Sequence, residues 1–291
     1  MKSITGQTQI FGIFGDPILH TLSPVMHNAA FAALDLPYSY LPFEVHPEGL
    51  ERAVKAILPL GLRGLNVTIP HKETVIPFLD SLDEEAGRIG AVNTIEVVSR
   101  RLIGRNTDGR GFLQSLREAD VDPKGLRVIL LGAGGAAKAV ASALAMASIS
   151  EMIIVARSAR RATELSHRLT AIASHLKITV QPADFKPDKR FDSKTPTLVI
   201  NSTPLGMKPS DPLPFPASLI RPEWIVADLI YRPHHTSLLA EAKQIGARVV
   251  PGLGMLLHQG ALSFEIWTKQ SPPILVMRKA LQEALSEIIL R

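Results

Sequence analysis

The chain has 291 residues, 46% of them hydrophobic and 20% charged, and it carries a formal net charge of +5. This composition is typical of a soluble globular protein, and the length favours two domains over one. Because the chain has no cysteine, disulfides, thiolate metal sites and cysteine nucleophiles are excluded.

The distribution of charged and apolar residues argues against two kinds of partner. Lysine and arginine are scattered rather than clustered, so we expect no nucleic-acid partner. No apolar run approaches the roughly 18 residues of a transmembrane helix, so we expect no membrane partner. The first residues lack the apolar core of a signal peptide, which makes the cytoplasm the expected location.

The first third of the sequence alternates strand and helix patterns. Apolar runs predict strands at residues 9–16, 38–45 and 64–70. Ser23, followed by Pro24, predicts the serine cap of a helix, and residues 47–57 form a second, amphipathic helical pattern. A hairpin is expected around residues 99–101. This order predicts an α/β domain with a mostly parallel sheet.

From about residue 108 the pattern becomes that of a doubly wound nucleotide-binding domain. A helix is predicted at 109–119, followed by a strand, a glycine-rich turn and an alanine-rich helix within 125–147. Further strands are predicted within residues 151–161, 197–207, 223–231 and 247–252. The C-terminal residues are nearly all helical, and residues 186–196 are the most loop-like stretch.

These patterns predict two domains with a discontinuous first domain. The C-terminal helices are expected to return to the N-terminal part of the chain. We therefore predict a substrate-binding and catalytic domain from residues 1–107 and 253–291, and a Rossmann-type domain from residues 108–252.

The glycine-rich turn fits a dinucleotide-binding fingerprint. In LLGAGGAA, Gly132, Gly134 and Ala137 have the G-x-G-x-x-G/A spacing between a predicted strand and a predicted helix. The first glycine permits a tight turn, and the second lets the backbone approach a pyrophosphate at the helix N-terminus. The residues expected to contact the cofactor are Gly132, Ala133, Gly134, Gly135 and Ala136.

The end of the next strand indicates which dinucleotide is bound. An NAD-binding domain usually has Asp or Glu here, bonded to the ribose hydroxyl. The sequence instead has Ala156 followed by Arg157, Ser158, Arg160 and Arg161. Guanidinium groups pair with the 2′-phosphate of NADP, whereas an acid would repel it. We therefore predict NADP(H), with Arg157 as the main contact and Ser158 and Arg161 beside it.

Polar side chains gather at the predicted strand ends of the first domain. They are Thr21, Ser23, Asn66, Thr68, Lys72, Asn93, Asn106, Thr107 and Asp108. Ligands bind at the carboxyl ends of parallel strands, so we expect these side chains to converge. Hydroxyls, amides and one Lys–Asp pair suit a polyhydroxylated carboxylic acid.

The segment NVTIPHK predicts how three of these residues meet. Strand alternation places Asn66 and Thr68 on one face. Pro70 ends the strand, so that Lys72 can reach over the same cavity.

Together these motifs resemble the shikimate dehydrogenase family of NADP-dependent reductases. The matching segments lie within residues 11–268 and are FGDPILHTLSPVMHNAAF, NVTIPHKE, GAVNTI, NTDGRGF, GAGGAA, NSTPLGM, ADLIYRPHHTSLL and PGLGMLLHQGALSFEIWT. The resemblance implies the reversible reduction of 3-dehydroshikimate to shikimate in the biosynthesis of chorismate and aromatic amino acids. We expect a monomer or a homodimer.

The resemblance also implies roles for individual residues. Lys72 would be the acid/base, working with Asp108. The residues that would bind substrate are Thr21 and Ser23 at the carboxylate, Asn66, Thr68, Asn93 and Gln259 at the ring hydroxyls, and Tyr231. The further residues along the cofactor would be Ser202, Thr203, Gly252 and Met255.

Three alternatives stay open. Thr21 stands where the family usually has serine, so a quinate/shikimate dehydrogenase of broader specificity is one. A non-catalytic NADP-sensing regulator is another, although it would have no need of Lys72 and Asp108. A metal-dependent hydrolase is disfavoured because the nine histidines lack a spacing such as H-E-x-x-H, and no metal is expected.

Overall fold

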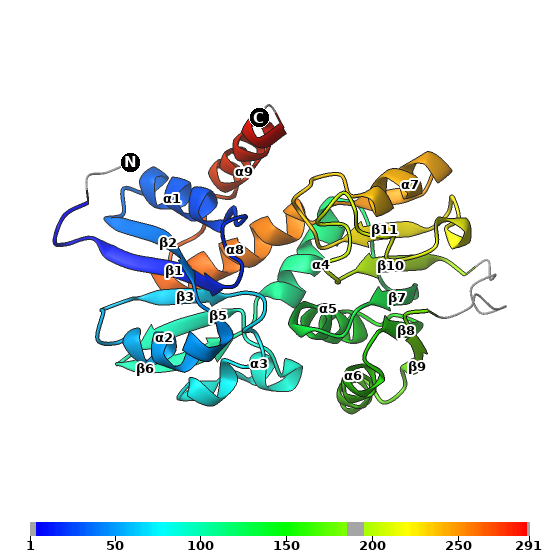
Figure 1. The fold of residues 1–291 in the computed structure, drawn as a ribbon, viewed down its shortest axis with the longest axis horizontal. Coiled ribbons are helices and arrows are strands. Elements are labelled where there is room, and N and C mark those ends of the chain that lie inside the picture. The colour runs from blue at the N-terminus through cyan, green and yellow to red at the C-terminus, as the bar shows by residue number, and fades with distance from the viewer. Residues whose placement is uncertain (1–3, 185–194, 290–291) are drawn as a thin grey trace. The chain divides into compact units, whose positions relative to one another are not determined.

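The structure, a computed structural model, describes residues 4–184 and 195–289 (Figure 1). Most of the predicted loop at 186–196 therefore lies outside the described residues. The chain forms two compact units, residues 1–111 with 256–291 and residues 112–255. The predicted domain limits coincide with the starts of two helices, α4 (Asp108–Glu118) and α8 (Leu253–Thr268). The two compact units instead divide within these helices, after Gly111 and after Met255.

The first unit contains a mixed six-stranded sheet in the order β2-β1-β3-β5-β6-β4. Its strands are β1 (Gln9–Gly15), β2 (Tyr38–Glu44), β3 (Gly64–Val67), β4 (Ser81–Leu82), β5 (Thr94–Val98) and β6 (Arg101–Arg105). β1 pairs in parallel with β2 and β3, and β4 with β6, whereas β3–β5 and β5–β6 are antiparallel. The predicted hairpin is confirmed, with Ser99 and Arg100 at φ 49° and 61° in its two-residue turn.

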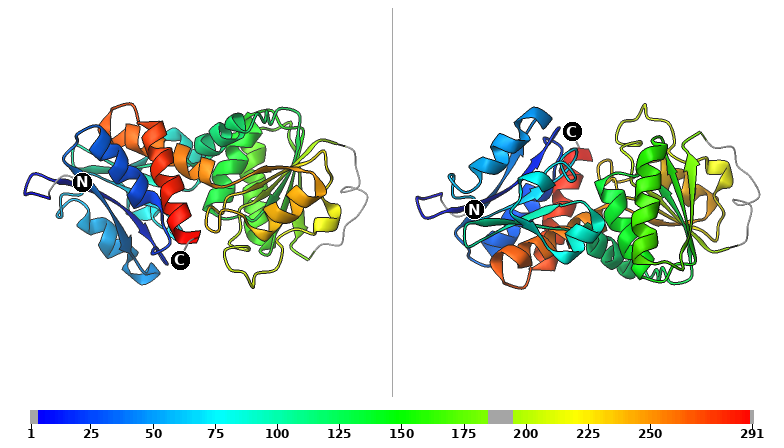
Figure 2. Two further views of the ribbon diagram at one scale, coloured as in Figure 1. Left: turned by 90° about the horizontal axis from the view of Figure 1, so that it is seen from above. Right: turned by 90° about the horizontal axis from the view of Figure 1, so that it is seen from below.

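Helices cover this sheet and include the C-terminal part of the chain. They are α1 (Ser23–Ala33), α2 (Leu50–Ala56) after the short helix η1 (Pro47–Gly49), η2 (Ile76–Phe78), α3 (Glu84–Ile89), α8 and α9 (Ile274–Ile289). α9 lies alongside α1 (Figure 2). Phe31 of α1 and Phe264 of α8 pack with ring centroids 5.5 Å apart. The predicted return of the C-terminal helices is confirmed.

The start of α1 differs from the prediction. Ser23 is the first helical residue, and the cap position, Leu22, makes no side-chain cap. The hydroxyl of Thr21 instead accepts a hydrogen bond from the amide of Ser23 at 3.3 Å. The predicted serine cap is therefore wrong, because Ser23 is itself the first helical residue and not the residue before the helix. Pro24 lies in the first turn, as expected.

The second unit contains a parallel six-stranded sheet in the order β12-β11-β10-β7-β8-β9. Its strands are β7 (Arg127–Leu131), β8 (Glu151–Ala156), β9 (Lys177–Pro182), β10 (Thr197–Asn201), β11 (Ile225–Asp228) and β12 (Arg248–Val250). Its other elements are α4, α5 (Gly135–Met146), α6 (Ala159–Ile172), η3 (Ala217–Leu219) and α7 (Ser237–Ile245). This is the doubly wound order, and its chain reversal lies between β7 and β10.

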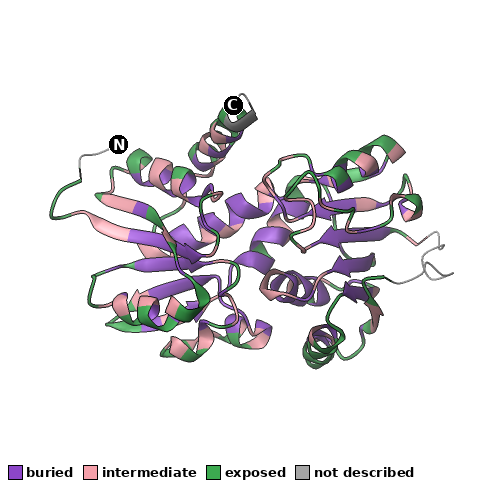
Figure 3. Cartoon of the chain, viewed as in Figure 1, coloured by how far each residue is buried: buried purple, intermediate pink, exposed green. Residues whose placement is uncertain are grey.

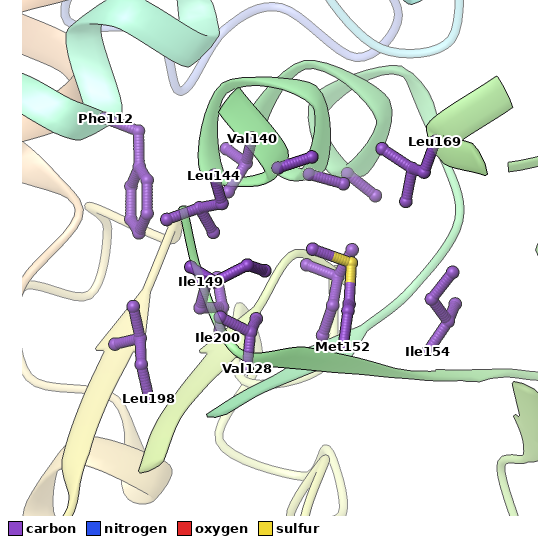
Figure 4. Close-up of a cluster of buried hydrophobic side chains, with 14 of the residues drawn as sticks. Phe112, Val128, Val140, Leu144, Ile149, Met152, Ile154, Leu169, Leu198 and Ile200 are labelled. Atoms are coloured by element: carbon purple, nitrogen blue, oxygen red, sulfur yellow. The ribbon is translucent and has the colours of Figure 1, made fainter. Parts of the chain in front are cut away.

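Both faces of this second sheet are buried. Val128 and Leu130 of β7 pack with Val140 and Leu144 of α5, in the cluster that Figure 4 shows. The alternate residues of the same strands lie in a separate cluster around Trp224 on the opposite face. The central strands are therefore almost entirely buried (Figure 3). Their continuous apolar sequence follows from burial on both faces.

None of the helices among the residues that the structure describes is long and apolar enough to cross a membrane.

Candidate active site

A lysine–aspartate pair lies at the carboxyl end of β3. Lys72 follows the turn after this strand, and Asp108 is the first residue of α4. The Lys72 Nζ donates to Asp108 Oδ2 at 2.6 Å. The Lys72 side chain is 14% exposed and that of Asp108 4% exposed, so the carboxylate is buried and the lysine keeps only slight exposure.

Asn93 holds the other oxygen of this carboxylate. Its Nδ2 donates to Asp108 Oδ1 at 2.8 Å and to Gln259 Oε1 at 3.2 Å. Its Oδ1 accepts from the amide of Thr107 at 2.9 Å. The amide of Asp108 donates to Asn106 Oδ1 at 3.0 Å. Both carboxylate oxygens and the backbone of Asp108 are therefore held by the protein's own hydrogen bonds.

Asn66 forms a second buried polar cluster beside the first. The hydroxyl of Tyr40 donates to Asn66 Oδ1 at 2.7 Å. Asn66 Nδ2 donates to Ser263 Oγ and the carbonyl of Asn93, each at 3.0 Å, and lies 3.2 Å from Thr94 Oγ1. These partners orient the Asn66 amide, so its oxygen and nitrogen positions are set by the protein.

An aromatic group supports Tyr40 from behind. The rings of Tyr40 and His27 are stacked, with centroids 4.4 Å apart and planes at 12°. Burial lowers the pKa of His27 to about 3, so its imidazole is neutral at physiological pH. The ring of Tyr40, whose hydroxyl bonds to Asn66, therefore stacks on an uncharged aromatic ring.

The turn that carries Lys72 starts earlier than predicted. β3 ends at Val67 rather than Pro70, because the amide of His71 bonds back to the carbonyl of Thr68 at 2.8 Å and closes a turn. Thr68 directly follows the strand, and its amide still donates to the carbonyl of Phe14 in β1 at 2.9 Å, so the shared face of Asn66 and Thr68 stays a prediction. The buried ring of His71 contacts the carbonyl of Val45 at 2.6 Å.

The residues predicted to bind a carboxylate lie at the same edge of the sheet. Thr21 and Ser23 follow the end of β1, and Ser23 is buried. A Cβ at Gly15, the last residue of β1, would overlap the methyl group of Thr68. Thr68 therefore lies directly against this strand end. Within the described residues, no hydrogen bond joins Thr21, Ser23 or Thr68 to the Lys72–Asp108 pair.

The second unit has a phosphate-type turn between β7 and α5. Gly132 has φ +107°, which side-chain-bearing residues rarely adopt. Gly134 is the N-cap of α5 and offers no side-chain cap, so the first amides of the helix keep free hydrogens. A Cβ at Gly134 would meet no atom within 4 Å. An open space in front of uncapped amides fits a pyrophosphate group.

The other predicted cofactor residues lie in sequence-distant segments of the same unit. Arg157 follows β8 and is exposed, and the Ser158 hydroxyl caps α6 by accepting from the amide of Arg161 at 3.4 Å. Ser202 Oγ donates to the carbonyl of Leu131, immediately before the turn, at 2.5 Å. The remaining cofactor residues are Thr203 after β10 and the buried Gly252 and Met255. Tyr231, predicted to bind substrate, is half-buried after β11.

Gly252 approaches the turn after β11 very closely. A Cβ at Gly252 would lie 2.6 Å from the carbonyl oxygens of Leu229 and Ile230. Only glycine allows this approach without displacing the backbone that leads to Tyr231. No group of three or more His, Asp or Glu side chains in the described part of the chain could hold a metal ion.

Sequence reasoning missed several members of the two buried clusters. Tyr40, Thr94 and Ser263 were not singled out, although Ser263 lies one helical turn after Gln259 and hence on the same face of α8. Asp228 was placed in a predicted strand and in one of the family motifs, with no role assigned to it.

The two units together have the architecture of a two-domain dehydrogenase, with a dinucleotide-binding fold in one unit and a lysine–carboxylate site in the other. Three family models match the chain. They describe the shikimate dehydrogenase substrate binding domain at residues 13–95, shikimate / quinate 5-dehydrogenase at 115–181, and the shikimate 5′-dehydrogenase C-terminal domain at 252–282.

Proteins of similar sequence or structure align with nearly the whole chain. Shikimate dehydrogenase (NADP(+)) of Moorella thermoacetica is 46% identical over 286 residues, covering 98% of this chain and 96% of that protein. A crystal structure of a shikimate dehydrogenase in complex with NADP+ has a TM-score of 0.87 at 38% identity, covering 97% and 98% of the two chains. Quinate dehydrogenase from Corynebacterium glutamicum in complex with NAD has a TM-score of 0.85 at 29% identity, covering 95% and 99%. The chain belongs to the shikimate dehydrogenase family.

Proposed function

We propose that this protein is a shikimate dehydrogenase that reversibly reduces 3-dehydroshikimate to shikimate with NADPH, in the biosynthesis of chorismate and aromatic amino acids. The observation that carries the proposal is the 2.6 Å contact of Lys72 Nζ with a buried Asp108, inside a shell of amides and hydroxyls. The names of relatives that align over nearly the full chain support the same activity. The cytoplasm is the proposed location, and a chain without cysteine fits that reducing compartment.

The chemistry requires a hydride and a proton. NADPH, when bound, supplies the hydride to the ketone carbon. The Lys72 ammonium stabilises the negative charge that develops on the carbonyl oxygen and donates the proton. Asp108 holds Lys72 through one oxygen, is itself held by Asn93 through the other, and accepts from a neighbouring substrate hydroxyl. In the direction of oxidation, Lys72 removes the hydroxyl proton.

The proposed binding residues supply matching groups. The substrate carboxylate is bound by Thr21 and Ser23, and the further substrate contacts are Asn66, Thr68, Asn93, Tyr231 and Gln259. The adenosine 2′-phosphate pairs with Arg157, beside Ser158 and Arg161, and the pyrophosphate lies at the turn of Gly132, Ala133, Gly134, Gly135 and Ala136. The remaining cofactor contacts are Ser202, Thr203, Gly252 and Met255. The exposed guanidinium of Arg157 and the uncapped start of α5 support this assignment.

Arg157→Ala is expected to raise the KM for NADP+ by roughly 10- to 100-fold, because a charge-assisted bond to phosphate contributes about 1.5–3 kcal/mol. The KM for NAD+, which lacks the 2′-phosphate, should stay unchanged. Steady-state rates with each cofactor measure both values. Arg160→Ala is the control, since its guanidinium pairs with Glu164 at 3.0 Å. An unchanged KM for NADP+ in Arg157→Ala would exclude Arg157 from the phosphate site.

The proposed function is tested by initial rates at 340 nm with shikimate or quinate, each with NADP+ or NAD+. We expect activity chiefly with shikimate and NADP+. Comparable rates with quinate would support the broader quinate/shikimate dehydrogenase, consistent with the extra methyl of Thr21. NADP+ binding without turnover of either substrate would support the regulator.

A further inference from the structure

A buried carboxylate in the second unit has no role in the proposed chemistry. Asp228 is the last residue of β11 and is 1% exposed. It accepts hydrogen bonds from Asn201 Nδ2 at 3.1 Å, from the amide of Ile230 at 3.0 Å and from Thr236 Oγ1 at 2.8 Å. In the described part of the chain, no cationic side chain forms an ion pair with it.

One of these donors shapes the loop after β10. Asn201 Oδ1 accepts from the amide and the hydroxyl of Thr203, at 3.0 and 2.7 Å. Its Nδ2 donates to the carbonyl of Leu205 at 2.9 Å as well as to Asp228. The amide and hydroxyl of Ser202 both donate to the carbonyl of Leu131. Residues 202–206 are thereby held against the start of the phosphate-type turn.

The other two donors shape the turn after β11. The amide of Ile230 fixes the backbone one residue before Tyr231. The Thr236 hydroxyl donates to Asp228 and also caps α7 by accepting from the amide of Leu239 at 3.3 Å. One carboxylate therefore ties together two loops that both lie at the carboxyl edge of the sheet, where ligands bind in this fold.

An ionised carboxylate at position 228 does not stabilise the folded protein. Burial raises the pKa of Asp228 to about 6, so the folded protein binds this proton more readily than the unfolded chain does. Between about pH 4 and pH 6, this raised pKa makes the folded state lose stability as the pH rises. At neutral pH the buried charge is therefore unfavourable, which points to a role other than stabilisation.

We propose that Asp228 is a positioning residue of the dinucleotide site, holding residues 202–206 and the turn 229–236 in one arrangement beside the turn at Gly132. The proposal rests on the proposed function for the identity of the dinucleotide, NADP(H). Asp228 acts through its hydrogen bonds to three partners, so an amide that can bond to the same three partners can replace it.

The test is the dissociation constant of NADP+, measured by titration calorimetry on the full chain, together with the Tm of each variant. Asp228→Ala should raise the Kd at least about tenfold, because three buried donors lose their acceptor. Asp228→Asn should stay within about threefold of the wild type, since its amide can accept from Asn201 and Ile230 and donate to Thr236. Asp122→Ala, at an exposed aspartate of the same unit, should leave the Kd unchanged.

Two results would overturn the proposal: a wild-type Kd in Asp228→Ala, or an Asp228→Asn variant that binds as weakly as Asp228→Ala. If Asp228→Ala does not fold, Thr236→Val and Thr236→Ser take its place. Val lacks the hydroxyl and should weaken NADP+ binding, whereas Ser keeps it and should not. Equal Kd values for these two would reject the role of Asp228.

Calorimetry needs no turnover, so the proposal and the proposed function can fail separately. A wild type that binds NADP+ but oxidises no shikimate rejects only the function. Normal NADP+ affinity in Asp228→Ala, in a chain whose wild type is active, rejects only the positioning role.

Discussion

Replacing Lys72 by alanine is expected to lower kcat for shikimate oxidation by roughly 10²- to 10⁴-fold, the range typical of a lost acid–base group. The KM for shikimate should change by less than about threefold, because the proposed contacts to its carboxylate and ring hydroxyls do not involve Lys72. The reason is the position of the amine, 2.6 Å from a carboxylate held on its other side by Asn93. Steady-state rates over a range of shikimate concentrations separate kcat from KM.

Lys55→Ala is the matched control for this variant. Lys55 forms an exposed pair with Glu51 in α2, at 2.6 Å, and its loss should leave both kinetic constants unchanged. The Tm of each variant shows whether the fold persists, since Lys72→Ala leaves Asp108 without its cationic partner. A Lys72→Ala enzyme with near-normal kcat would remove Lys72 from the chemistry.

The second large effect concerns the close contact of Gly111, in α4, with Gln259, in α8, both of which belong to the first unit. A Cβ at Gly111 would lie 2.6 Å from the amide nitrogen of Gln259 and 2.8 Å from its Cβ. Because these atoms belong to or adjoin the backbone, the helices themselves must separate. Overpacking costs up to about 3 kcal/mol, and the gain in helix propensity from Gly to Ala offsets about 1 kcal/mol. Gly111→Ala should therefore lower the free energy of unfolding by about 1–2 kcal/mol.

The same substitution should also reduce activity. Separation of the helices would lengthen the bonds from Thr107 Oγ1 to the carbonyl of Gln259, at 3.0 Å, and from Asn93 to Gln259 Oε1, at 3.2 Å. We expect kcat/KM for shikimate to fall by about tenfold, equivalent to ~1.4 kcal/mol of transition-state stabilisation.

Gly87→Ala is the control, because it should change the free energy of unfolding in the opposite direction. Gly87 lies inside α3, and a Cβ there would meet no atom within 4 Å. Alanine should therefore raise the free energy of unfolding by about 0.5–1 kcal/mol and leave activity unchanged. Urea unfolding of both variants tests the pair, and a stabilised Gly111→Ala protein would contradict the close approach of α4 and α8.

Much of the second unit could be predicted because its signals are local. Gly132 and Gly134 lie between an apolar strand and an alanine-rich helix, and a glycine at φ +107° is a requirement of that one turn. The strands around it are apolar throughout because both faces of the sheet are buried. The edge strand β9 (Lys177–Pro182) was not predicted. Its residues are only half-buried or exposed, so the strand lacks a continuous apolar sequence.

Helix and strand ends were predicted less well, because competing hydrogen bonds decide them. Ser23 and Pro24 mark the start of a helix, yet the hydroxyl of Thr21 accepts from the amide of Ser23, and the helix begins at Ser23 rather than after it. β3 stops at Val67 because His71 bonds back to Thr68, and no local pattern in NVTIPHK distinguishes that turn from a longer strand.

The sequence by itself determined the fold class, the dinucleotide turn and the residue types at the strand ends, and its motifs identified the family. The tertiary structure alone decided which groups meet. Asn66 donates a hydrogen bond to Ser263, which is 197 positions away in the sequence. Asp228 accepts hydrogen bonds from Asn201 and Thr236, which lie in different segments. Strand, turn and cap signals act within a few residues, whereas a buried hydrogen bond depends on the path of the whole chain between its partners.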